Sequence, residues 1–98
     1  MAWIPASIRF PYPIDGLTFS AIVREETLGS NLPRFRMGRD QVDRYVEAIG
    51  DPTWAVLEPD GLILTHDGDG ETRIQQDAAG LYDFSRAGIP ILVMSDLD

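Results

Sequence analysis

The sequence predicts a domain of the α+β class that is mainly β: a small antiparallel sandwich or sheet of hairpins with one amphipathic helix over about residues 39–49. Three observations support this fold class. Apolar residues recur with a helical period in one segment, a Pro-Asp-Gly turn separates two apolar runs at 59–61, and apolar and polar residues alternate over 17–24. At 98 residues, the chain fits a single domain, 1–98, with a modest core.

The first half of the chain predicts strands before the helix. Pro5, Pro11 and Pro13 cannot donate to a strand ladder, so residues 3–14 are expected to form an extended edge segment. After the Asp15-Gly16 turn, the alternation over 17–24 predicts a half-buried strand, and residues 32–37 predict a short edge strand.

The helix is predicted from its apolar stripe and from its ends. Four apolar residues stand at i, i+3, i+4 and i+7: Val42, Tyr45, Val46 and Ile49. Asp40 is expected to cap the first turn, Gly50 to end the helix in a left-handed conformation, and Pro52 to prevent its continuation.

The second half predicts a β meander. Residues 53–58 and 62–66 form a hairpin whose three-residue turn ends with Gly61 in the left-handed position. Glu58 is then opposite Leu62 and Trp54 opposite His66, and the two apolar faces of this ribbon are expected to lie between other layers. Residues 71–76, 81–85 and 89–94 predict further strands, giving six to eight short strands in all.

Two short patterns resemble known families. Ile74, Asp77, Gly80 and Tyr82 resemble the corner before the penultimate strand of immunoglobulin-like sandwiches, with one residue more between Asp77 and Gly80. The run from Arg39 to Pro52 is similar to the helix entry of MaoC-like hotdog hydratases. That resemblance implies a thioester enzyme with Asp51 as an acid catalyst, but the His of the family pattern is missing from residues 53–55.

The charge pattern limits the partners of the chain. Every cation is Arg, and the net charge of −8 arises after residue 49, where ten carboxylates face only Arg73 and Arg86. Such a surface repels phosphate backbones, so no direct nucleic-acid binding is expected. We also expect no membrane span and no signal peptide, and a cytoplasmic or virion-associated location.

Few residues indicate catalysis or metal binding. The chain has no Cys and one His, so no metal site and no cofactor are expected. His66 beside Asp67 is compatible with a general base, but no nucleophile accompanies it in the sequence. Residues 67–71 have the oxygen density of a calcium loop without its Gly and Glu spacing, which favours a plain turn.

The function predicted from these features is a small non-enzymatic protein-binding or assembly module, of a bacterial or phage type, that docks on another protein or on itself. The expected docking residues combine arginine with an aromatic ring, a pairing enriched at interface centres: Arg34, Phe35, Arg36 and Arg39. The alternative is an inhibitor that imitates nucleic acid with an acidic surface comprising Asp67, Asp69, Glu71 and Asp77.

Overall fold

The computed structural model describes residues 2–11, 16–65, 71–85 and 87–96, and it confirms the predicted fold class. Two antiparallel sheets accompany one helix, α1 (Arg39–Ile49), and one 3-10 turn, η1 (Glu25–Thr27). The five-stranded sheet has the order β7 (Tyr82–Asp83), β3 (Phe35–Met37), β2 (Thr18–Arg24), β1 (Trp3–Arg9) and β8 (Leu92–Asp96). The three-stranded sheet has the order β4 (Ala55–Glu58), β5 (Gly61–Leu64) and β6 (Thr72–Gln75).

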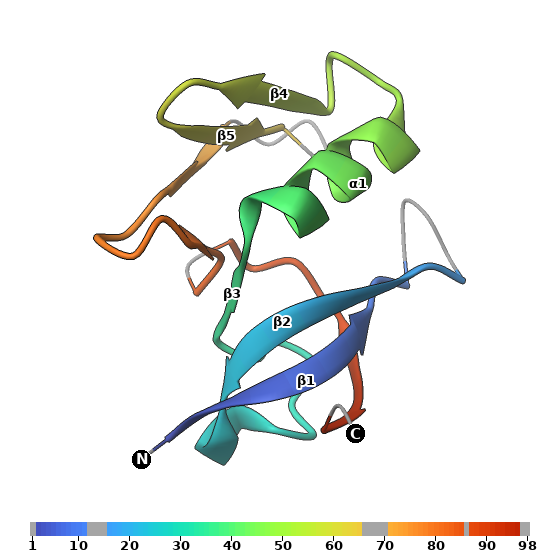
Figure 1. The fold of residues 1–98 in the computed structure, drawn as a ribbon. Helices are drawn as coiled ribbons and strands as arrows, with labels where there is room; N and C mark the ends of the chain where they lie inside the picture. Colours follow the sequence, from blue (N-terminus) through green and yellow to red (C-terminus); the bar gives the residue numbers. More distant parts are fainter. Residues whose placement is uncertain (1, 12–15, 66–70, 86, 97–98) are drawn as a thin grey trace.

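The helix lies between the two sheets and spans the predicted residues. Figure 1 shows α1 between the β4–β5 hairpin and β2, and it contacts both β2 and β4. Val42 and Tyr45 are fully buried, and Val46 and Ile49 pack partly against the core, as the apolar stripe predicted. Gly50 ends the helix at φ 66°, also as predicted. The N-cap, however, is Gly38 rather than Asp40, which lies in the first turn.

An aromatic cluster around Tyr45 joins the helix to both sheets. The Tyr45 ring stacks on Phe10 with a centroid distance of 4.6 Å and meets Phe19 edge to face at 5.8 Å. Phe84 and Trp54 contact Tyr45 edge to face at 6.2 and 6.5 Å. Since aromatic pairs of these geometries stabilise a fold beyond the area they bury, this cluster forms the centre of the core.

The segment predicted at an edge is instead an interior strand. β1 pairs with β2 over its whole length and with β8 from Ala6 to Arg9. The prolines do not prevent this, because Pro5 precedes the first residue paired with β8 and Pro11 follows the end of the strand. β3 is shorter than the predicted 32–37, and it lies between β2 and β7, so it is also interior rather than at an edge.

The predicted register of the hairpin is wrong by one residue. Glu58 pairs with Gly61 and Leu57 with Leu62, so only Pro59 and Asp60 form the turn. Gly61 is required for a different reason from the one predicted: a Cβ at this position would lie 2.4 Å from the carbonyl oxygen of Ile74 in β6. The predicted pairing of Trp54 with His66 cannot be compared, because His66 lies outside the described residues. The Trp54 carbonyl accepts a hydrogen bond of 2.9 Å from Thr65 N–H.

The ribbon also does not lie between two layers as expected. Ala55, Leu62 and Leu64 bury one face, whereas Val56 on the opposite face is 44% exposed and Ile63 is half-buried. The three-stranded sheet thus has one core face and one open face, the usual arrangement of a small antiparallel sheet.

The corner between β6 and β7 links the two sheets. An isolated bridge joins Gln76 to Tyr82, and Tyr82 also pairs with Met37 of β3. The Asp77 carboxylate accepts hydrogen bonds from the amides of Ala79 and Leu81 at 2.9 and 3.0 Å, and Gly80 adopts φ 83°. The last strand begins at Leu92, later than predicted, because Ile89 and Ile91 are buried in the connection before it.

Candidate functional site

The outward face of the five-stranded sheet carries an arginine and aromatic surface. Strand pairing places Trp3 opposite Arg24 in a first row across the sheet. In the adjacent second row, Ile22 lies opposite Pro5 on one side and Arg36 on the other. Arg34 extends the first row, because its carbonyl accepts a hydrogen bond of 2.9 Å from Arg24 N–H. Six residues define this surface, here called the Arg–Trp face: Trp3, Pro5, Ile22, Arg24, Arg34 and Arg36. Each is half-buried or exposed.

Trp3 lies between two guanidinium groups. The Cζ atoms of Arg36 and Arg24 lie 4.2 and 5.3 Å from its ring centroid, well within the range of cation–π attraction. Each arginine also has a carboxylate partner: Arg24 Nε lies 2.7 Å from Glu26 Oε1, and Arg36 NH1 lies 3.5 Å from Asp77 Oδ2. The Arg24 hydrogen bond lowers the pKa of Glu26, so this pair is ionised at neutral pH.

The predicted docking residues do not all share this face. Arg34 and Arg36 point outward, but the alternation of the strand turns Phe35 into the core, where it is 1% exposed and stacks on Phe84 at 4.9 Å. Arg39 belongs to the first turn of α1 and binds Asp43 at 2.9 Å and the Tyr82 hydroxyl at 3.2 Å. The expectation that the Phe35 ring is available to a partner is therefore corrected.

Sequence reasoning missed Ile22 and Arg24, and it did not place Trp3 on the same surface as these two residues. The available signal was the period-2 alternation of residues 18–24, which places Ile22 and Arg24 opposite the buried Ala21 and Val23. The pairing of β1 with β2, which brings Trp3 beside Arg24, could not be read from either segment alone.

An apolar groove borders the second row of the Arg–Trp face. It encloses about 260 Å³, which is below the usual 300–1,000 Å³ of small-molecule pockets. This groove, here called the Ile22 groove, is lined mainly by apolar residues with a guanidinium and an amide among them: Pro5, Ala21, Ile22, Leu81, Arg36 and Gln41. The Gln41 amide oxygen is already used, since it accepts hydrogen bonds from Ser20 N–H and from Arg44.

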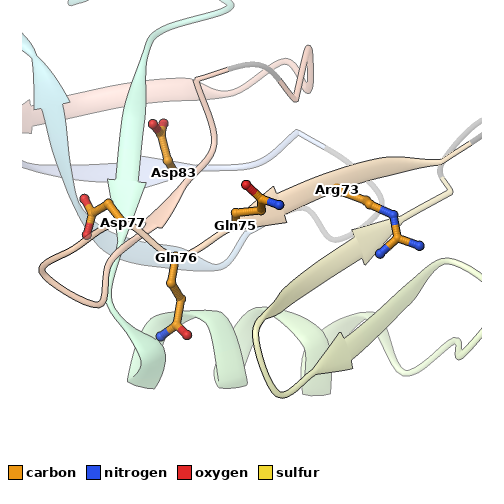
Figure 2. A pocket seen from close by; sticks show the side chains of 5 residues that line it. All are labelled: Arg73, Gln75, Gln76, Asp77 and Asp83. Carbon is orange, nitrogen blue, oxygen red and sulfur yellow. The ribbon is translucent and has the colours of Figure 1, made fainter.

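A polar hollow lies behind the corner that links the sheets. Its volume is about 300 Å³, and it is lined by Arg73, Gln75, Gln76, Asp77 and Asp83. Figure 2 shows the two carboxylates at one end and Arg73 at the other. Arg73 lies 3.5 Å from Glu58 and 3.7 Å from Glu71, and Asp77 already binds Arg36. The charged side chains of this hollow thus have partners within the protein.

Asp83 is held in its ionised form. Partial burial raises its pKa, but hydrogen bonding to Ser85, whose amide donates at 2.9 Å, together with the charges of Arg36 and Arg34, keeps the pKa below its usual range. Asp83 pairs with Arg36 across the strands, so the charge that acts on this carboxylate belongs to a residue at the border of the Arg–Trp face.

The other acidic residues of interest serve local structure where they are described. Asp51 accepts hydrogen bonds from the hydroxyl and the amide of Thr53 at 2.7 and 2.9 Å, which lowers its pKa and makes it a turn residue after α1. Of the predicted acidic surface, Glu71 pairs with Arg73 and Asp77 with Arg36, whereas Asp67 and Asp69 lie outside the described residues, as does most of the possible calcium loop.

In the described part of the chain, no group of three or more His, Cys, Asp or Glu side chains could hold a metal ion. No helix in the same residues is long and apolar enough to cross a membrane. Comparison with protein-family models, with curated proteins and with solved structures gave no match for this chain.

Proposed function

We propose that this chain is a non-enzymatic protein-binding or assembly module that docks on a larger complex through the Arg–Trp face. One observation carries the proposal: a half-buried tryptophan on the outward face of the five-stranded sheet, with two arginine guanidinium groups within cation–π distance of its ring. Trp and Arg are the residue types most enriched at the energetic centres of interfaces. The pre-formed stack limits the side-chain entropy that is lost on binding.

The setting of the stack supports this assignment. Apolar surface from Ile22 and Pro5 adjoins the guanidinium groups, so the face combines an apolar centre with charges near it, the usual composition of protein interfaces. The Ile22 groove and the polar hollow offer few free functional groups for catalysis, because Arg73, Asp77 and Asp83 are already bonded within the chain. A docking role therefore fits the geometry better than a thioester enzyme acting through Asp51, whose carboxylate binds Thr53.

The acidic inhibitor is the second candidate, favoured by the net charge of −8. The two residues of its predicted acidic surface that the structure describes, Glu71 and Asp77, are paired with arginine, which reduces the charge they offer to a basic groove. The two functions differ in salt dependence: a nucleic-acid mimic loses affinity steeply as salt rises, whereas docking through a partly apolar face loses less.

Affinity capture with paired variants tests the proposal. The wild-type chain and Ile22→Asp, which places a charge at the centre of the Arg–Trp face, are used as baits in extract of the source cells. Val56→Asp, at a more exposed apolar position on the open face of the other sheet, is the control for a new charge on an apolar strand position. We expect a partner that wild type and Val56→Asp retain and that Ile22→Asp loses. A partner retained equally by all three would contradict the proposal.

A further inference from the structure

We infer that the Arg–Trp face binds an extended acidic segment of another protein, with an aliphatic side chain in the Ile22 groove and a carboxylate, two residues away, on Arg34 of the first row. This inference rests on the proposed docking function and names the chemistry of the partner. It follows from the charge of the face, the size of the groove and the spacing between the two rows.

The charge of the first row favours carboxylates. Arg24 and Arg34 are neighbours there, but Arg24 is already bonded to both carboxylate oxygens of Glu26, at 2.7 and 3.1 Å. Among the described residues Arg34 forms no salt bridge, although its charge acts on Asp83. The exposed Arg34 guanidinium is therefore the group that can bind an acidic side chain, since its fork of donors matches the two oxygens of a carboxylate.

The Ile22 groove sets the size of the apolar part. The open groove of about 260 Å³ bounded by Pro5, Ile22 and Leu81 has room for an aliphatic side chain and is smaller than the usual small-molecule pocket. The groove and the first row are separated by two residues along each strand, or roughly 6–7 Å. An extended segment spans the same distance between residues i and i+2, which places an acidic residue and an aliphatic residue at that spacing.

The net charge indicates that the occupant is not a second copy of this chain. Each copy carries −8, so two copies repel one another over the distances at which encounters are steered. A separate protein of neutral or positive net charge that presents a locally acidic segment meets no such long-range repulsion.

Selection from random-sequence peptides displayed on phage tests the inference. The probe is the library itself, and the enriched peptides are then synthesised and titrated against the wild-type chain, Ile22→Asp, Arg34→Glu and Val56→Asp. We expect enriched peptides to carry Asp or Glu two positions from Leu, Ile, Val or Met. Their affinity should fall by at least about tenfold with Ile22→Asp and with Arg34→Glu, and should be unchanged with Val56→Asp.

The outcomes separate this inference from the proposed function. Arg34 is exposed, so Arg34→Glu provides a readout even if Ile22→Asp fails to fold. Enriched peptides that lack acidic residues, or that bind Arg34→Glu as tightly as wild type, overturn the inference, as does a selection that enriches no peptide dependent on these residues. Sedimentation showing a dimer that Arg34→Glu dissociates would also overturn it, in favour of a second copy. The docking function itself fails only if the captured partner ignores Ile22→Asp.

Discussion

The guanidinium carbon of Arg36 lies 4.2 Å from the centroid of the Trp3 ring. Arg36 also binds Asp77, the residue whose carboxylate accepts the amide hydrogen bonds of the corner between β6 and β7. One side chain therefore connects the first strand of the chain to the corner that joins the two sheets. The Arg–Trp face is consequently part of the tertiary structure as well as a candidate docking surface.

Trp3→Ala is expected to destabilise the fold, because it removes both cation–π contacts and part of the cover over β1 and β2. The expected loss is about 1–3 kcal/mol in the free energy of unfolding. Urea unfolding followed by circular dichroism measures this change. Trp3→Phe keeps an aromatic ring and should recover part of the loss. A Trp3→Ala variant as stable as wild type would show that the contacts of Trp3 with the two arginines do not stabilise the fold.

Phe35→Ala and Arg34→Ala test the inward and outward alternation of β3. Phe35 is 1% exposed and stacks on Phe84, so its truncation leaves a core cavity and should cost about 3–5 kcal/mol. Arg34→Ala, one position away on the exposed side, should change stability by no more than about 0.5 kcal/mol. Thermal or urea unfolding of both variants provides the comparison, and similar costs for the two would refute the orientation of the strand.

Gly61→Ala tests the corrected register of the β4–β5 hairpin. A Cβ at Gly61 would lie 2.4 Å from the Ile74 carbonyl oxygen, so β5 and β6 would have to separate at an expected cost of about 2 kcal/mol or more. Gly38→Ala is the matched control, because nothing lies within 4 Å of its added Cβ, and a change within about 1 kcal/mol is expected. Equal tolerance of the two substitutions in urea unfolding would favour the three-residue turn.

The sequence was sufficient for elements whose signals are local. The helical stripe of Val42 and Tyr45 and the left-handed Gly50 lie within a few residues of one another, and both were predicted correctly. The turn at 59–61 was located correctly, but the role of Gly61 depends on Ile74. The register error followed from that non-local contact, since a glycine needed for close packing and one needed for a positive φ look the same in a sequence.

The candidate site was predicted only in part for a similar reason. Arg34 and Arg36 were identified from their alternation with Phe35, but the buried side of that alternation was assigned to the surface. Trp3 was assigned to an edge segment because of the prolines that follow it. Which strand lies beside β1 is set by pairing across the sheet, and this pairing is what places Trp3 between Arg24 and Arg36.

The stability of the fold should decrease in acid through Asp83 and Asp51. Both have a pKa below the ordinary value in the folded protein, so their ionised forms are favoured by folding. Their contribution is present above the unfolded pKa of about 3.9 and is lost as the pH falls through the lower folded pKa. Urea titrations between about pH 5 and pH 3 should show a shallower decline for Asp83→Asn and for Asp51→Asn than for wild type. Curves parallel to wild type would contradict the assigned hydrogen bonds.

A photo-reactive amino acid placed at position 22 tests the docking account most directly. Benzoylphenylalanine replaces Ile22 in one variant and Val56 in the other, and both are irradiated in the source cells. We expect the variant substituted at position 22, at the centre of the Arg–Trp face, to cross-link a partner protein. The variant substituted at position 56 should not cross-link that same protein. Cross-links from position 56 to the same partner, with none from position 22, would contradict the assignment of the docking surface.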